Sequence, residues 1–261
     1  MGKRFRLTKK TYYTTEADSR YWSASFVKGM MECPARTLAE LRGEYERPES
    51  EALLVGSYVD SYFDGAKVFN AFTDEHPQIF NTRTGELKAP YKLADAMIRR
   101  AENEDGFMLY LRGRKQRIFT GEIDGIRFKC KLDFMTKDRI VDLKTVKDFY
   151  PVYKEGQGKV DFATAWNWPL QLAIYQEIVR QNIGEKLPTY LACITKQDPP
   201  DLAVVEIPQE QLDAEMAVLR QKLPLFEAMR LGVIEAPRCN HCAYCRQSRT
   251  ITRPLSITEF N

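Results

Sequence analysis

The sequence has little that would direct the chain to a membrane or to a strongly charged partner. Its basic N-terminus, MGKRFRLTKKTYY, lacks the apolar segment of a signal peptide, and no apolar run is long enough to span a bilayer. We therefore expect a cytoplasmic protein with no membrane association. The formal net charge is only +3, from 39 Lys and Arg against 36 Asp and Glu, so only local basic patches could attract nucleic acid.

Internal repeats and low-complexity linkers are also missing. The chain has 261 residues, of which 44% are hydrophobic, and this length allows a large buried core. We expect one globular domain over 1–261, with an N-terminal helical part at about 20–105 and a cysteine-rich tail at about 236–261.

Hydrophobic periodicity predicts helices first and then a mixture of strands and helices. The helices are expected at 22–45, 50–65, 91–105, 162–184 and 209–232. Three strands are expected within 116–145, with hairpin turns at Asp124-Gly125 and Lys137-Asp138, and two more at 189–196 and 202–208. This order predicts an α/β (α+β) fold with a mixed central sheet of about five strands flanked by helices.

A carboxylate and a lysine share one face of the predicted strand IVDLKTV, residues 140–146. Residues i and i+2 of a strand point to the same side, so Asp142 and Lys144 would project together. Asp133 lies in the preceding strand at a similar distance from the turn, which would bring two carboxylates together. Such a pair repels unless a cation lies between its members, and Mg²⁺ or Mn²⁺ suits oxygen ligands with an open hydration shell. The alternative is an ion pair on the polar outer face of a hairpin.

These segments resemble a known group of nucleases. LDFM followed by IVDLKT is similar to the D-(x)n-(D/E)-x-K core of the PD-(D/E)xK superfamily. QLAIY places Gln171 and Tyr175 on one helix face and matches the QxxxY motif of RecB-family nucleases. The order of motifs from Trp22 to Arg249 resembles that of the phage and prophage relatives of exodeoxyribonuclease VIII, the RecE-type exonucleases. The resemblance implies a restriction-endonuclease-like core.

The resemblance also implies where a metal would bind. Asp133 and Asp142 would be ligands, and the backbone carbonyl of Leu143 could contribute. The helix LLVGSYVDSYFDG resembles one that these enzymes carry upstream, where many relatives have a metal-facing histidine. This chain has Asp60 there, and a carboxylate is an equally suitable ligand for a hard cation, directly or through water.

The remaining motif residues would act on the substrate. The resemblance implies that Lys144 positions and activates the attacking water, and that Gln171 and Tyr175 orient the phosphate or base. It further implies a Mg²⁺-dependent deoxyribonuclease, an exonuclease acting on DNA ends, that works with a single-strand annealing recombinase in phage recombination. Two alternatives stay open: an endonuclease on the same core, and a non-catalytic DNA-binding module with a structural cysteine cluster. A complete carboxylate–lysine set argues against the second, because a binding module needs only positive charge.

The cysteines point to a second metal site. In a reducing compartment their clustering indicates metal binding rather than disulfides. Cys239, Cys242 and Cys245 form a CxxCxxC loop that needs a fourth ligand. Similarity to RecB-like nucleases with an iron–sulfur cluster, which extends to ECPARTLAEL, makes Cys33 the expected fourth ligand, with His241 as an alternative. We expect a [4Fe–4S] cluster, with Zn²⁺ or no metal as the alternatives, and we interpret Cys130 and Cys193 as buried, inert thiols.

Overall fold

The computed structural model of the chain describes residues 5–251, 253, 254, 256 and 257. The remaining positions of the expected 1–261 domain, including part of its cysteine-rich tail, lie outside the described residues. The chain divides into two compact units. Unit 1 comprises Met1–Ala24 and Pro48–Gln221, and unit 2 comprises Ser25–Arg47 and Lys222–Asn261.

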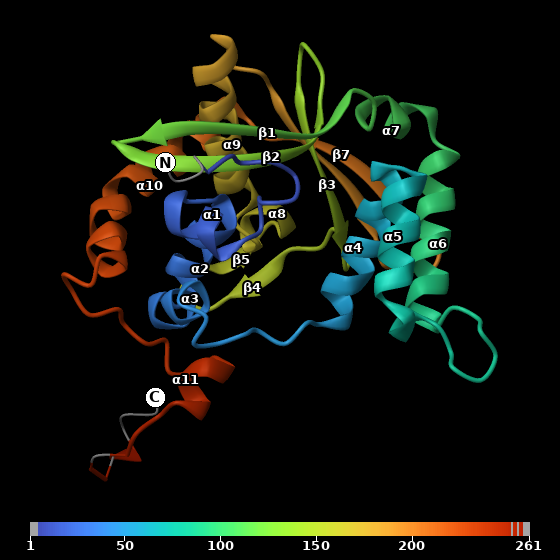
Figure 1. The fold of residues 1–261 in the computed structure, drawn as a ribbon. Coiled ribbons are helices and arrows are strands. Elements are labelled where there is room, and N and C mark those ends of the chain that lie inside the picture. The colour runs from blue at the N-terminus through green and yellow to red at the C-terminus, as the bar shows by residue number, and fades with distance from the viewer. Residues whose placement is uncertain (1–4, 252, 255, 258–261) are drawn as a thin grey trace. The chain divides into compact units, whose positions relative to one another are not determined.

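Unit 1 is built on a five-stranded mixed sheet (Figure 1). Its strands are β1 (Arg114–Ile123), β2 (Ile126–Met135), β3 (Ile140–Val146), β6 (Thr189–Thr195) and β7 (Leu202–Glu206). Their order is β1-β2-β3-β6-β7; β3 and β6 pair in parallel and all other neighbours are antiparallel. The predicted mixed sheet of about five strands flanked by helices is therefore confirmed. A separate hairpin, β4 (Val152–Lys154) and β5 (Gly158–Val160), follows β3.

The turn between β1 and β2 shows why the first hairpin forms where the sequence predicts it. Asp124 and Gly125 have φ values of 49° and 79°, and both lie between the paired residues Ile123 and Ile126. Two-residue turns with positive φ at both positions match the twist of antiparallel strands, and Asp-Gly is among the dipeptides that adopt them most readily.

Helices of unit 1 cover the sheet. They are α1 (Thr15–Arg20), α4 (Glu51–Asp64), α5 (Ala66–Glu75), α6 (Ala89–Glu102), α7 (Asp105–Tyr110), α8 (Phe162–Ala165), α9 (Trp168–Ile183) and the start of α10 (Gln209–Arg230), with a 3-10 turn η1 at Pro77–Ile79. A core cluster joins α4, α6 and α7 to the sheet face that carries Phe134, Val141 and Leu143. Because side chains alternate along a strand, Asp142 and Lys144 project from the other side of β3.

The predicted helix 162–184 is two helices, α8 and α9. Asn167 has a positive φ of 53° between them, and Pro169 lies in the first turn of α9. The N–H that proline lacks would have no intrahelical partner there, so Pro169 begins this helix instead of kinking it.

Unit 2 combines short helices from its N-terminal stretch with helices from its C-terminal stretch. They are α2 (Ala24–Glu32), which begins at the last residue of the first stretch of unit 1, then α3 (Pro34–Leu41), the end of α10, and α11 (Ala243–Gln247). The predicted helix 22–45 is interrupted at Cys33, whose backbone is extended with φ −159° and ψ 94°. A residue that precedes proline is disfavoured in the helical region, so Pro34 ends one helix and begins the next. None of the helices in the described part of the chain is long and apolar enough to cross a membrane.

Candidate active site

The candidate site lies where β2 and β3 separate. Their ladder consists of only two residue pairs, Phe134 with Val141 and Met135 with Ile140, although both strands continue beyond them. At the next position of β2, a side chain and not the main chain bonds to β3. Oδ2 of Asp133 accepts a hydrogen bond of 3.0 Å from the backbone N–H of Leu143. The carboxylate therefore lies in the gap between the strands, beside the main chain that precedes Lys144.

Asp142 is the buried centre of the site, with only 3% of its surface exposed. Its Oδ1 accepts a hydrogen bond of 2.9 Å from the side-chain amide of Gln171 on α9, and the same amide lies 3.3 Å from the hydroxyl of Tyr175. Residues 171 and 175 are one helical turn apart and so lie on one face of α9. The structure thus brings the QxxxY residues onto the carboxylate, a contact that the sequence did not predict, because both residues were expected to orient the substrate phosphate or base.

Lys144 forms an ion pair with Oδ2 of Asp142. This oxygen is buried, and the Lys144 ammonium group is its partner. Burial by itself lowers the pKa of Lys144, but the carboxylates of Asp142 and Asp133 outweigh that effect, and the pKa is raised above its usual value. Lys144 is consequently held as a cation beside both carboxylates.

Asp60 approaches the site from α4. Gly56, one turn earlier on the same helix, lies so close to β3 that a Cβ atom there would be 3.3 Å from Oγ1 of Thr145. The absence of a side chain at this position allows α4 to pack closely on β3. Asp60, one turn later on the same helix face, is close enough to Lys144 and Asp142 for their charges to shift its pKa.

The pKa values of the carboxyl groups show that they form one electrostatic group. Burial raises the pKa of Asp133 well above its usual value, and the negative charges of Asp142 and Asp60 add to this while Lys144 opposes it. The Asp60 side chain is exposed to solvent, although many protein atoms surround its carboxyl group. Its pKa is raised to about 7, first by this partial removal from water and then by Asp142, against the effect of Lys144. Excess negative charge of this kind favours cation binding.

These residues fit a hard divalent cation. Two buried carboxylates, those of Asp133 and Asp142, lie beside the gap between β2 and β3, with Lys144 as a neighbouring cation. The oxygens of Asp60, Asp133 and Asp142 do not all lie within 4.8 Å of one another. Ligands of one Mg²⁺ at about 2.1 Å would be no more than about 4.2 Å apart. The positions therefore favour contact of the solvent-exposed Asp60 through water.

Sequence reasoning missed three residues around the site. Asp64, one turn after Asp60, accepts a hydrogen bond of 2.8 Å from Gln116, and Lys131 lies two residues before Asp133 on the same side of β2. The positive charge of Lys131 lowers the pKa of both Asp60 and Asp64 against the effect of their burial. The i, i+2 and i, i+4 spacings could have identified Lys131 and Asp64, whereas Gln116 carries no such signal.

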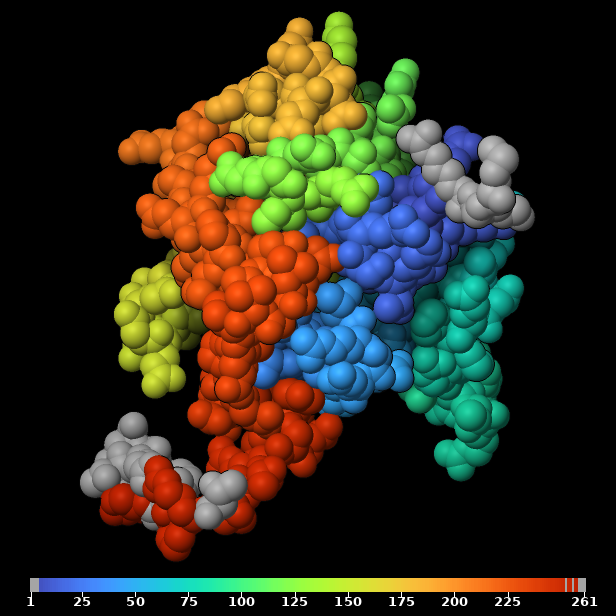
Figure 2. Space-filling model, turned by 60° about the vertical axis from the view of Figure 1, so that its left-hand side comes forward, coloured from blue at the N-terminus to red at the C-terminus, as the bar shows by residue number. Residues whose placement is uncertain are grey.

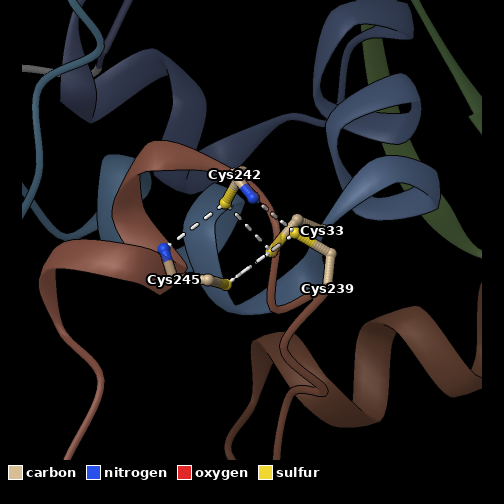
Figure 3. Close-up of side chains that lie close together, drawn as sticks. All are labelled: Cys33, Cys239, Cys242 and Cys245. Carbon is tan, nitrogen blue, oxygen red and sulfur yellow. Dashed lines mark hydrogen bonds between the residues drawn. The ribbon is translucent and has the colours of Figure 1, made fainter. Parts of the chain in front are cut away.

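In unit 2, the structure brings together Cys33, Cys239, Cys242 and Cys245 (Figure 3). All four sulfur atoms lie within 4.8 Å of one another. The separations are 3.5 Å between Cys33 and Cys245, 3.9 Å between Cys33 and Cys242, and 3.9 Å between Cys239 and Cys245. Cys33 is thus the fourth member of the group, whereas His241 is not part of it. Cys130 and Cys193 are buried in β2 and β6, as predicted.

Backbone N–H groups stabilise thiolates in this cluster. The N–H of Cys242 lies 3.4 Å from the sulfur of Cys239, and the N–H of Cys245 lies 3.4 Å from the sulfur of Cys242. Burial raises the pKa of Cys239, but N–H groups, chiefly those of Cys242 and His241, outweigh it and bring the pKa to about 6. Four convergent thiols with at least one held as a thiolate suit a metal.

The sulfur spacing can be compared with the geometry of two kinds of metal group. Four sulfurs at about 2.3 Å from one tetrahedral Zn²⁺ are about 3.8 Å apart, close to the separations of 3.5 and 3.9 Å. In a cuboidal [4Fe–4S] cluster each cysteine binds a different iron atom at a different corner, so the four sulfurs would have to lie farther apart.

Comparison with known proteins agrees with the fold. A family described as a PDDEXK-like domain of unknown function matches residues 23–248. A crystal structure from Eubacterium rectale, of a protein given the provisional description of an exonuclease, is 37% identical. The match has a TM-score of 0.94 and covers 98% of each chain. A search of curated proteins gave no match. The chain therefore belongs to the family of PDDEXK-like domains and is a nuclease of the PD-(D/E)xK type.

Proposed function

We propose that this protein is a Mg²⁺-dependent exodeoxyribonuclease that acts on DNA ends in the cytoplasm. The observation that carries this proposal is the convergence of Asp133, Asp142 and Lys144 at the point where β2 and β3 separate, with Gln171 holding Asp142. Free cysteines at all six positions fit a reducing compartment.

Asp133, Asp142 and the carbonyl of Leu143 would hold the ion, which could be Mn²⁺ in place of Mg²⁺, with Asp60 contributing through water. When bound, the metal supplies positive charge at the phosphate and a more acidic water. Gln171 fixes the orientation of the Asp142 carboxylate through its amide, and Tyr175 supports that amide. Lys144 provides a fixed cation that can orient the attacking water and neutralise charge on a phosphoryl oxygen.

The proposal of exonuclease activity, as opposed to endonuclease activity, rests on similarity to other proteins. The resemblance to RecE-type enzymes and the provisional description of the Eubacterium rectale protein both favour action at DNA ends. The same resemblance supports a role in phage or prophage recombination with a single-strand annealing recombinase as partner. We further propose that units 1 and 2 serve as one nuclease domain, as expected from the sequence.

The decisive experiment compares end-labelled linear DNA with closed circular DNA in Mg²⁺. We expect stepwise degradation of the linear form only, and loss of activity with preserved DNA binding in Asp142→Ala and Lys144→Ala, because groups that act as a unit fail together. Lys147→Ala is the matched control, since Lys147 also pairs with an aspartate, Asp148, but at 3.8 Å and with its side chain 95% exposed.

Each other outcome contradicts part of the proposal. Cleavage of the circle would indicate an endonuclease, and binding without hydrolysis would indicate a DNA-binding module. If Asp142→Ala or Lys144→Ala kept near wild-type turnover, the assignment of the DLK segment to the catalytic site would be wrong.

For the cysteine cluster we propose a structural metal site. The resemblance led us to expect [4Fe–4S], but the sulfur spacing favours one tetrahedral Zn²⁺. Metal binding by residues so far apart in the chain would contribute directly to the stability of unit 2. After anaerobic purification, we expect about one equivalent of zinc per chain, lost in Cys33→Ser and retained in Cys130→Ala. Iron with matching sulfide would instead establish the cluster, and metal-free protein of unchanged thermal stability would exclude both.

A further inference from the structure

An exposed tyrosine lies beside the candidate active site with a lysine over its ring. Tyr13 is 71% exposed, and Nζ of Lys131 is 4.5 Å from the centroid of its ring. Lys131 and Asp133 are on the same side of β2, about 7 Å apart along the strand. Tyr12 is also close, because Nζ of Lys131 lies 5.8 Å from the centroid of its ring.

The segment that carries Tyr13 is firmly attached to β2. Lys129, which is 1% exposed, donates hydrogen bonds to the carbonyl of Tyr12 and, at 2.6 Å, to Asp18. Trp22 forms a bridge with β2: its N–H donates to Arg127 and its carbonyl accepts from Lys129, both at 2.8 Å. In the space-filling view this blue segment lies directly against the green β1–β2 hairpin (Figure 2). The ring of Tyr13 is therefore presented by an ordered support.

Tyr12 keeps the Tyr13 ring in place. The two rings meet edge to face, with centroids 4.9 Å apart and an interplanar angle of 80°. Tyr13 remains largely exposed to solvent in this edge-to-face arrangement. An aromatic ring that is fixed, exposed and adjacent to a cation has the two features that recur where proteins hold single-stranded nucleic acid.

The side chains around Tyr13 are mostly basic, although Lys9 and Lys131 also act electrostatically on Asp64, and Lys131 on Asp60. Within the described residues, Arg6, Lys9, Lys10 and Lys131 have no carboxylate within 4.0 Å of their charged nitrogens. The acidic residues of this segment are already engaged, since Glu16 pairs with Arg20 and Asp18 with Lys129. The segment thus offers positive charge to a polyanion next to a site that is itself strongly acidic.

We propose that Tyr13 and Lys131 form a binding subsite for an unpaired DNA strand immediately beside the scissile phosphate. Tyr13 stacks on a base and Lys131 contacts the neighbouring phosphate. Bases in a duplex already stack on one another, so a protein ring gains most from a base that has left its pair. This inference rests on the proposed nuclease function, and it adds that the substrate strand is single-stranded where it reaches Asp133.

The test measures binding and turnover separately. Fluorescence anisotropy gives the Kd for a labelled single-stranded oligonucleotide and for a blunt duplex, with Ca²⁺ replacing Mg²⁺. Steady-state assays in Mg²⁺ with a tailed duplex give KM and kcat. We expect Tyr13→Ala to raise the single-strand Kd and the KM about tenfold with little change in kcat, and Tyr13→Phe to behave as wild type. Lys131→Met should weaken binding and reduce the slope of log Kd against log salt by about one phosphate contact.

Tyr153→Ala is the matched control. Tyr153 on β4 is 73% exposed and has Lys159 as its cross-strand partner, which reproduces the aromatic–lysine pair. Unchanged binding in Tyr13→Ala, or an equal loss in Tyr153→Ala, would overturn the proposal. If wild-type protein neither binds nor hydrolyses DNA, the proposed function fails and this inference with it. Hydrolysis by the wild type with no effect at Tyr13 would refute the inference alone.

Discussion

Gln171 offers the sharpest test of how the site is held together. Its side-chain amide donates a hydrogen bond of 2.9 Å to Asp142 and lies 3.3 Å from the Tyr175 hydroxyl. Gln171→Ala removes the donor and leaves Oδ1 of a carboxylate that is 3% exposed without this partner. We expect the variant to fold but to hydrolyse DNA slowly, because Asp142 is then free to rotate away from its working orientation.

The magnitude follows from the kind of bond that is lost. A hydrogen bond to a charged group contributes about 1.5–3 kcal/mol. If that energy is fully expressed in the transition state, kcat/KM falls by about tenfold to about 150-fold. The assay is the initial rate of nucleotide release from a linear duplex in Mg²⁺, with circular dichroism and urea unfolding to report on the fold.

Gln176 provides a matched control on the same helix. It is 4% exposed and donates at 2.9 Å to the carbonyl of Leu187, a neutral partner that has no part in the site. Gln176→Ala should lower the free energy of unfolding by about 1–3 kcal/mol and leave kcat/KM unchanged below the unfolding transition. Equal losses of activity in both variants, or full activity in Gln171→Ala, would refute the reasoning.

Two further predictions concern packing and pH. Gly56→Leu should lower the free energy of unfolding by about 1–3 kcal/mol in urea titrations, because α4 must move away from Thr145. Ser57→Leu is the control and should leave the free energy of unfolding unchanged, because Ser57 is on the exposed side of α4. Equal effects of the two substitutions would contradict the close approach of α4 to β3. Asp161 caps α8 by accepting from the N–H groups of Ala163 and Thr164, both at 2.9 Å. Burial raises the pKa of Asp161, but the Thr164 hydroxyl and then these N–H groups outweigh it and lower the pKa below its usual value. A depressed folded-state pKa gives stability that is present above the unfolded pKa of about 3.9 and is lost as pH falls through the folded value. The cost of Asp161→Ala, about 0.5–2 kcal/mol at pH 6, should therefore shrink as the pH falls below the unfolded pKa of about 3.9. A difference that stays constant as the pH is lowered would exclude the charged cap.

The sheet could be predicted because its signals are local. Alternation along 116–145 and the Asp124-Gly125 turn fix β1 and β2, and the run IVDLKTV fixes β3. The pairing of Asp142 with Lys144 follows from the two-residue period of a strand. The ends of the helices were harder to predict from the sequence. The break at Cys33, for example, arises because proline disfavours a helical backbone at the residue before it.

The parts of the site that were missed depend on contacts between distant segments. The gap between β2 and β3 is visible only when both strands are placed, since nothing in LDFM indicates that Asp133 will bond the main chain of Leu143. The position of Tyr13 beside Lys131 requires the attachment of Tyr12 to Lys129, residues separated by 117 positions. The spacing of the cysteine sulfurs likewise needs coordinates, because the CxxCxxC pattern is compatible with either metal group.

The cysteine cluster sets an order of events during synthesis. Cys33 and Cys245 are separated by 212 positions. At about 5–20 residues per second, roughly 10–40 s pass between the emergence of the two from the ribosome. The second stretch of unit 1, Pro48–Gln221, is translated within that interval and can fold before unit 2 has all its ligands. During this time Cys33 is a lone nascent thiol, and metal loading is confined to the last moments of biogenesis, so a ribosome that stops before Cys239 releases a chain that cannot complete the cluster.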